Sequence, residues 1–316
     1  MRLITSQIMT MKKQWHNKTI SILVFIIAVF AISATTIGIF SSDGSGQYEF
    51  KSIRGKTVMI YGKGLYKHMS AEVAPQGIAQ DYITLFAGIP SLLISLFLAR
   101  KGSLKGKYLL AGTLGYFLVT YLFYTVMGMY NKMFLAYVVL MGASFYAFLL
   151  TLLSFPINNL KDKFKASTPV KATGGFLIFN SIAIGSLWLS IVIPPLLEGT
   201  VIPVQVEHYT TLIVQGLDLG ILLPAAFICG LLLRKKQPLG YVLAPTYFVF
   251  LSLLMTALTA KVIAMWSLGY NVVPVIFIIP TFNVITIVCT VLLLGNVGEK
   301  TPLTEKRNYE KLTYAK

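Results

Sequence analysis

The feature that most constrains this chain is a series of eight apolar segments, each about as long as a membrane-spanning helix. Within a few residues they lie at 20–40, 82–99, 108–128, 133–155, 174–196, 209–233, 239–260 and 272–295. A spanning helix needs about 20 apolar residues, and its backbone must satisfy its hydrogen bonds internally. The segments do not alternate apolar and polar residues as barrel strands do. They predict an all-α transmembrane fold, an eight-helix bundle.

The composition excludes several classes of protein. Charged residues make up 12% of the 316 positions and hydrophobic residues 56%, whereas soluble domains carry about 25% charged residues. An ordinary soluble enzyme, a disordered chain and a disulfide scaffold are therefore excluded. The net charge of +16 could indicate nucleic-acid binding, but the basic residues lie between apolar segments, as membrane topology requires. We expect the lipid bilayer as the surroundings and no nucleic-acid partner.

Basic residues predict the orientation. Most of the 27 lysines and arginines fall at five places that eight helices put on one side of the membrane. These are Arg2, Lys12, Lys13 and Lys18; Arg100, Lys101, Lys105 and Lys107; Lys161, Lys163, Lys165 and Lys171; Arg234, Lys235 and Lys236; and Lys300, Lys306, Arg307, Lys311 and Lys316. The positive-inside rule makes that side cytoplasmic. We expect a cell-membrane protein with both termini inside.

An alternative concerns the first helix, because Ala31–Ala34 resembles a signal-peptide cleavage site. Cleavage there would leave seven helices and the same orientation for the rest of the chain. The apolar run continues to Phe40, however, and is long enough to span the membrane. We therefore favour an uncleaved helix.

An internal duplication is the expected organisation. An offset of 134 residues aligns the second segment with the sixth and pairs Pro90 with Pro224, Arg100 with Arg234, Lys101 with Lys235, Gly106 with Gly240 and Leu109 with Leu243. This register predicts a parallel 4+4 arrangement, although membrane helices of similar composition also align by chance. The expected parts are a cytoplasmic segment 1–19, a first half 20–155, a cytoplasmic connection 156–173, a second half 174–295 and a cytoplasmic tail 296–316.

The long outer loop, residues 41–81, contains three short runs of aromatic and β-branched residues at 48–53, 57–61 and 65–69. Glycines separate these runs, as is typical of strands joined by turns. The pattern predicts a small β-rich cap on the extracytoplasmic side.

Motifs of known chemistry are absent from the sequence. It has no P-loop, no H-E-x-x-H and no G-x-S-x-G, and Cys229 and Cys289 are isolated in apolar runs. We expect no metal site, no cofactor and no catalytic residue, and the chain is more consistent with a non-enzyme. A membrane enzyme remains the third alternative, because an Asp and a Lys can act as acid and base.

Ionisable residues within or beside the spans are the strongest functional signal, because charges in a membrane usually face a cavity or pair with one another. Counting from residue 209, Asp218 lies roughly 13 Å deep, between Gly216 and Gly220, which would let a neighbouring helix approach closely. Other polar residues are expected near the same depth. The candidate ligand-binding residues are Asp218, Lys261, Asp81, Glu207, His208 and Gln215.

Each of these residues also has a simpler interpretation. Asp81, Lys261, Glu207 and His208 are typical of a membrane interface, where charged side chains are common. Asp218 and Lys261 could also form an ion pair that only fixes helix packing.

Two stretches resemble a group of uncharacterised multi-pass bacterial integral membrane proteins, over most of residues 60–265. The first contains Gly64-Leu65-Tyr66-Lys67, Gln76-Gly77, Gln80-Asp81, Thr84-Leu85, Gly88-Ile89-Pro90 and Arg100–Gly106. The second contains Leu217–Gly220, Pro224, Arg234–Lys236 and Gly240–Pro245. The resemblance implies a membrane class and location but no activity, because none is established for that group.

These observations favour binding or transport of a small solute through an outward-facing polar cavity. The alternative is a membrane-embedded sensor or assembly partner that acts through the outer loop 41–81.

Overall fold

The computed structural model describes residues 2–298 and is mostly helical. Within those residues, eight helices are long and apolar enough to cross a membrane: Asn17–Phe40, Val73–Arg100, Leu104–Val126, Phe134–Leu153, Val170–Leu197, Ile213–Arg234, Gly240–Ser267 and Val275–Gly295. These helices indicate a multi-pass membrane protein. The predicted basic tail residues 300–316 lie outside the described part of the chain.

The element bounds show that two of the spans are divided by π-helical turns. The elements are α1 (Arg2–Phe40), β1 (Tyr48–Lys51), β2 (Thr57–Ile60), α2 (Val73–Ile83), η1 (Thr84–Gly88), α3 (Ile89–Arg100), α4 (Leu104–Val126), α5 (Phe134–Leu153), η2 (Ile157–Asn159), η3 (Lys161–Lys163), α6 (Val170–Leu197), η4 (Val204–Val206), α7 (Ile213–Leu217), η5 (Asp218–Leu222), α8 (Leu223–Arg234), α9 (Gly240–Ser267) and α10 (Val275–Gly295).

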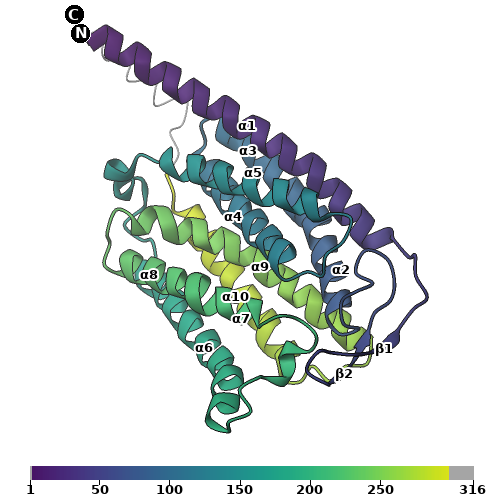
Figure 1. Cartoon of the computed structure of the whole chain (residues 1–316). Coiled ribbons are helices and arrows are strands. Elements are labelled where there is room, and N and C mark those ends of the chain that lie inside the picture. The colour runs from purple at the N-terminus through teal and green to yellow at the C-terminus, as the bar shows by residue number, and fades with distance from the viewer. Residues whose placement is uncertain (1, 299–316) are drawn as a thin grey trace, which may run out of the picture.

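Helices α4 and α9 form the centre of the bundle (Figure 1). Helix α4 contacts α3, α5 and α9, and α9 also contacts α2, α8 and α10. Helix α1 packs against α2, α3 and α5, while α6 packs mainly against α8. The core contains the fully buried aromatic side chains of Tyr108, Tyr116, Phe117 and Phe248, because aromatic rings supply much of the contact area between helices.

Small residues allow the closest helix contacts. A Cβ atom on Gly112 of α4 would overlap the side chain of Val249 on α9. Gly174 of α6 and Gly230 of α8 likewise lie against each other's backbone carbonyls. Association in a membrane depends on such close packing, because lipid is as apolar as the helices themselves.

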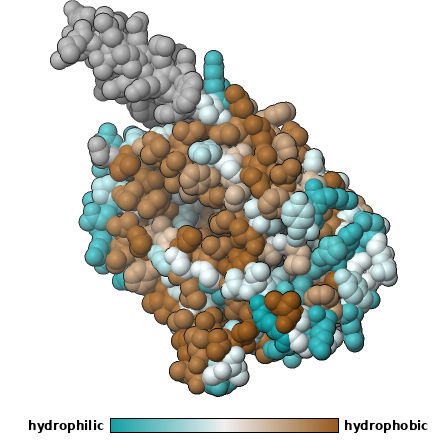
Figure 2. Space-filling view, in the orientation of Figure 1, coloured by the Kyte–Doolittle hydropathy of each residue, from teal (hydrophilic) through white to brown (hydrophobic). Residues whose placement is uncertain are grey.

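The surface has an apolar middle and a polar end. Figure 2 shows hydrophobic residues over the middle of this face and hydrophilic residues gathered where β1 and β2 lie. We call this the hairpin end. The other end, called the loop end, holds the connections 154–169 and 235–239. There the strand-like bridge between Phe164 and Val297, and a hydrogen bond from the Lys165 amide to the Asn296 carbonyl (3.0 Å), join the connection after α5 to the end of α10.

Two spanning helices contain a π-helical turn just before a proline. The turn η1 precedes Pro90 in α3, and η5 precedes Pro224 in α8. Proline has no N–H and disturbs the ladder of helical hydrogen bonds before it. π-Turns occur at such places and are frequent at functional sites.

The structure corrects three expectations about element bounds. The second span begins at Val73 rather than residue 82, and the seventh continues to Ser267 rather than 260. Polar residues inside these helices have partners that hydropathy does not reveal. The sixth begins at Ile213 rather than residue 209, which makes Asp218 its sixth residue, roughly 7 Å from that end.

The cap is smaller than expected. Strands β1 and β2 pair antiparallel, with Tyr48 opposite Ile60 and Lys51 opposite Thr57. The predicted third run, 65–69, forms turns, and only a single bridge between Ile60 and Ser70 continues the pairing. Leu65, Tyr66 and Met69 are buried against the bundle, so this run is apolar because it anchors the loop.

Candidate functional site

Three charged residues lie inside the spanning helices, beyond the four residues at either end of each span. They are Asp81 on α2, Asp218 at the start of η5, and Lys261 on α9. The structure thus places both Asp81 and Lys261 within helices, rather than at the ends where the sequence suggested them. Charged groups at such positions are costly in a bilayer unless they are paired, hydrogen-bonded or hydrated.

Asp81 is almost completely buried, with 1% of its surface exposed. The Tyr66 hydroxyl donates a hydrogen bond to Oδ2 (2.5 Å), and the Tyr124 hydroxyl is shared between Oδ1 (3.1 Å) and the Gly77 carbonyl (3.0 Å). On the remaining side, Gly38 of α1 lies so close that a Cβ atom there would overlap the carboxylate. Asp81 thus joins α1, the outer loop, α2 and α4 at one point.

Tyrosines surround this carboxylate. The rings of Tyr66, Tyr121, Tyr124 and Tyr137 pack edge to face or stacked, at centroid distances of 5.3 to 6.2 Å. Burial raises the pKa of the Tyr66 phenol well above its ordinary value, and the nearby Asp81 raises it further. Tyr66 therefore stays protonated and can donate to Asp81 at any physiological pH.

Asp218 has a different environment. It is partly exposed, and the Trp188 indole N–H of α6 donates to its Oδ2 atom at 2.8 Å. The predicted close helix approach at Gly216 and Gly220 is wrong, because both glycines face open space. The residue that gives Asp218 its hydrogen bond comes instead from a helix more than 20 positions earlier in the chain.

The backbone after Asp218 is held by side chains from two neighbouring helices. Tyr247 of α9 donates to the Leu222 carbonyl (2.8 Å), and Ser181 of α6 donates to the Leu223 carbonyl (2.7 Å). Pro224 has no N–H and so frees a carbonyl four or five residues before it. The Leu222 and Leu223 carbonyls lie after that point, and their bonds to Tyr247 and Ser181 join this part of the helix to α9 and α6.

Lys261 is the basic residue that attracts both carboxylates. It interacts with Asp81 and with Asp218, but it forms a close ion pair with neither. Among the side chains that the structure describes, the one ion pair joins Lys67 to Asp43 at 3.8 Å, at the hairpin end. The Asp218–Lys261 pair considered from sequence is therefore not closed here.

Glu207 and His208 lie in the connection between α6 and α7, beneath the hairpin. The Arg54 guanidinium donates to the carbonyls of Tyr209 (2.8 Å) and Thr210 (3.1 Å). The His208 ring nitrogen Nε2 lies 3.0 Å from the His68 carbonyl. This set of bonds, which we call the Arg54 latch, joins the loop of the first two spans to the loop of the fifth and sixth.

The last candidate is Gln215, and the structure adds Glu72, which was not a candidate from the sequence. Gln215 lies half-buried on α7, one turn before Asp218. In the loop under the hairpin, burial and the negative charge of Glu207 raise the pKa of Glu72. The two carboxylates are therefore near enough for their charges to repel.

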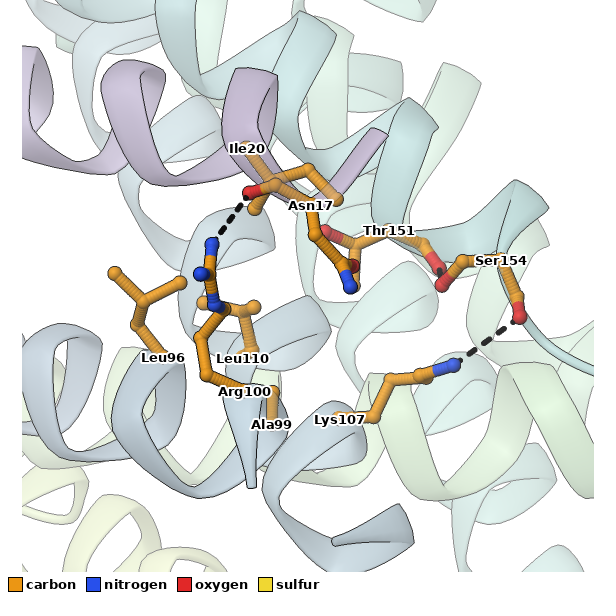
Figure 3. A pocket seen from close by; sticks show the side chains of 9 residues that line it. All are labelled: Asn17, Ile20, Leu96, Ala99, Arg100, Lys107, Leu110, Thr151 and Ser154. Carbon is orange, nitrogen blue, oxygen red and sulfur yellow. Dashed lines mark hydrogen bonds between the residues drawn. The ribbon is translucent and has the colours of Figure 1, made fainter. Parts of the chain in front are cut away.

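Two pockets lie away from these charges. One, of about 210 Å³, opens at the hairpin end between the outer loop and the turn after α4, and includes Lys67, His68 and Lys132. Another, of about 30 Å³, lies at the loop end (Figure 3). There Arg100 donates to the Asn17 carbonyl at 3.2 Å and Lys107 to the Ser154 carbonyl at 3.1 Å. A space of that size holds about one water molecule.

Sequence reasoning missed Tyr66, Tyr124 and Trp188 as partners of the two carboxylates. Their apolar surroundings make them look like ordinary core or interface aromatics. Nothing in a single sequence pairs Trp188 with a carboxylate 30 positions later. Among the side chains that the structure describes, no three of His, Cys, Asp or Glu are grouped so that they could bind one metal ion.

Comparison with known proteins yields no assignment. No family model matches the chain, no curated protein matches it, and no solved structure matches it.

Proposed function

We propose that this chain is a cell-membrane protein that binds and transports a small solute at a polar site formed by Asp218 and Lys261. The observation that supports this proposal is the environment of Asp218 within its span. It is a partly exposed carboxylate inside a span, at the first residue of a π-turn, and among the described residues it has one hydrogen-bond donor and no close counter-ion. A charge in that position is costly, and function is the usual reason for its presence.

The hairpin end faces outward in this proposal, and both termini are cytoplasmic. Support comes from the basic residues at the loop end, among them Arg100, Lys101, Arg234 and Lys235. Cytoplasmic loops carry such an excess of lysine and arginine. Asp218, near the hairpin end of its span, would then be reached from outside the cell.

A parallel 4+4 duplication is part of the proposal, because the same local geometry recurs at an offset of 134 residues. The first and last residues of η1 and of η5 differ by that offset, and so do the first and last residues of α3 and α8. Gly106 packs on the backbone of residues 98–99, and Gly240 packs on that of residues 232–233. Agreement in packing adds to the agreement in sequence, because composition alone does not set where a helix contacts the preceding one.

The contact between the proposed halves also supports the duplication. Gly112 of α4 lies against the Thr246 carbonyl of α9, and Thr246 is the residue that the offset pairs with Gly112. A residue that touches its own equivalent lies on a two-fold axis. Transporters are often built from two such repeats, with the site near their interface.

The offset also pairs Asp218 with Thr84. The Thr84 hydroxyl is fully buried, donates to the Gln80 carbonyl (2.8 Å) and shares a hydrogen bond with the Tyr116 hydroxyl (2.8 Å). The position is thus occupied by a buried, uncharged side chain in the first half and by a carboxylate in the second. We attribute the charge to a function of the second half, since packing at the equivalent position needs none.

Asp218→Asn tests the proposal. We expect purified wild-type protein to be stabilised by at least one member of a solute panel of amino acids, sugars, nucleosides and amines, since ligands that bind only the folded state raise Tm. The variant should lose that stabilisation and any uptake into proteoliposomes, while its own Tm stays close to that of the wild type.

Asp43→Asn is the matched control, because Asp43 is an exposed carboxylate at the same end. Its solute response should equal that of the wild type. Equal responses from wild type and Asp218→Asn would remove Asp218 from the site.

A second candidate function is partner binding through the outer loop. The hairpin exposes apolar side chains, with Ile53 94% exposed, Phe50 42% and Met59 43%. Exposed apolar clusters often mark interaction surfaces.

For this candidate, a variant with Ser at positions 50, 53 and 59 should lose a protein that co-purifies with wild type from native membranes. Asp218→Asn should retain that protein. Identical co-purification from wild type and the serine variant would exclude the hairpin as the contact.

A further inference from the structure

The charges inside the spans do not balance. Asp81 and Asp218 carry one negative charge each when ionised, and Lys261 supplies one positive charge. A fully ionised set would leave one net negative charge within the membrane, which is costly without a compensating cation. Either one more cation binds at this place, or one carboxylate is protonated.

The hydrogen bonds show which carboxylate is free to take a cation. Each oxygen of Asp81 receives a bond from a phenol, and both phenols are donors that favour the ionised form. Among the described residues, Asp218 receives one bond, from Trp188 to Oδ2. Asp218 is also the more exposed of the two, so the cation that balances the site should exchange there.

The surroundings of Asp218 fit a proton better than a metal ion. An alkali or alkaline-earth cation needs several oxygen ligands, whereas the group that contacts Asp218 is an N–H donor. The neighbouring Leu222 and Leu223 carbonyls are already occupied by the hydroxyls of Tyr247 and Ser181. A proton needs only the free oxygen of the carboxylate and a water molecule to deliver it.

We propose that Asp218 exchanges a proton with water at the hairpin end, and that solute movement is coupled to this proton. The inference rests on the proposed function. In the forward step hydronium transfers its proton to Oδ1 of the carboxylate, and water leaves. Protonation removes the attraction that Lys261 exerts on Asp218, so Lys261 remains attracted to Asp81 alone. The side-chain bonds around η5 allow α7 to respond, because they can break and reform without unfolding the helix.

Few other groups near Asp218 carry charge at neutral pH. Lys261 and Tyr247 face it from α9, and Trp188 faces it from α6. Helix α4, which also contacts α7, presents tyrosines towards Asp81, and phenols are neutral in this range. Glu72 in the outer loop is the carboxyl outside the spans that needs a control, because burial and Glu207 raise its pKa. A band that came from Asp81 would survive in Asp218→Asn.

Infrared spectroscopy of the full-length protein in phosphatidylcholine nanodiscs tests the proposal directly. At neutral pH ordinary carboxyl groups are ionised, so a band from a protonated carboxyl, identified by its shift in D₂O, reports a group like Asp218. We expect this band in wild type and in Glu72→Gln, and its loss in Asp218→Asn. Lys261→Met should increase the band, because two carboxylates then lack an internal cation.

Several outcomes would overturn the proposal. One is a wild type without the band. Another is a band that survives in Asp218→Asn. A third is a band that disappears when choline chloride is replaced by sodium or potassium chloride, which would assign the site to a metal cation.

The solute panel run on the same samples separates the two claims. Solute binding that depends on Asp218 without a carboxyl band overturns proton coupling alone. A carboxyl band without any solute response overturns the proposed function as well as the coupling. Asp218→Glu, which keeps the carboxyl, should retain the band if Asp218→Asn fails to fold.

Discussion

Asp81→Ala is expected to destabilise the protein by about 3 kcal/mol. The substitution leaves the buried Tyr66 hydroxyl without its acceptor and leaves the Tyr124 hydroxyl with the Gly77 carbonyl alone, and an unsatisfied buried donor costs about 1–3 kcal/mol. It also removes the contact that joins the outer loop to α1, α2 and α4. Thermal unfolding in detergent, followed by tryptophan fluorescence, should show a markedly lower Tm.

The matched control is Asp218→Ala, which removes a carboxylate that is partly exposed and accepts one hydrogen bond. It should lower Tm much less. Tyr66→Phe should reproduce part of the Asp81 effect, and combining it with Asp81→Ala should add little, because the same bond is already lost. Equal losses from Asp81→Ala and Asp218→Ala would contradict the structural role assigned to Asp81.

Gly112→Ala should destabilise the bundle by about 2 kcal/mol or more. The added methyl group would overlap the Val249 side chain and press on the Thr246 carbonyl of α9, and overpacking of a well-packed core typically costs about 1–3 kcal/mol. The two central helices would have to move apart along their whole crossing. A lower Tm and loss of monodisperse protein on size exclusion would report this.

Gly142→Ala is the control for this prediction, because Gly142 lies on α5 with open space around the position of a Cβ atom. Alanine favours a helix over glycine by about 1 kcal/mol, so this variant should be unchanged or slightly more stable. A Gly112→Ala protein that is as stable as Gly142→Ala would mean that α4 and α9 do not cross as closely as described.

The eight helices could be predicted because each span must be apolar along about 20 residues. The same reasoning misplaced the ends of the second and seventh spans, since it treats Asp81 and Lys261 as breaks. In the folded protein Asp81 is stabilised by two phenols, and Lys261 by electrostatic attraction to both carboxylates. These contacts join residues up to 180 positions apart, so no local window contains them.

The candidate site was predictable only in part. A charged residue is easy to recognise within an apolar segment, so Asp218 could be predicted as a candidate from the sequence alone. Its hydrogen-bond donor, Trp188, and its depth were not, because both depend on how helices pack and where α7 begins. Glu207 and His208 lie instead beside the Arg54 latch, because the connection after α6 folds beneath the hairpin. Whether Asp81, Gln215 and these two residues contact a ligand stays a prediction.

The π-turns also alter the angular phase of the two helices that contain them. A π-turn bonds each residue to the fifth one along rather than the fourth, so it holds one residue more than the α-helical turn it replaces. One residue corresponds to about 100° of rotation about a helix axis. Every side chain of α7 therefore points about 100° away from the direction that a continuous helix through α8 would give it. Removing one residue from η5 would therefore restore an ordinary α-helical turn and leave both Gln215 and Arg234 on the faces of the bundle that they now occupy.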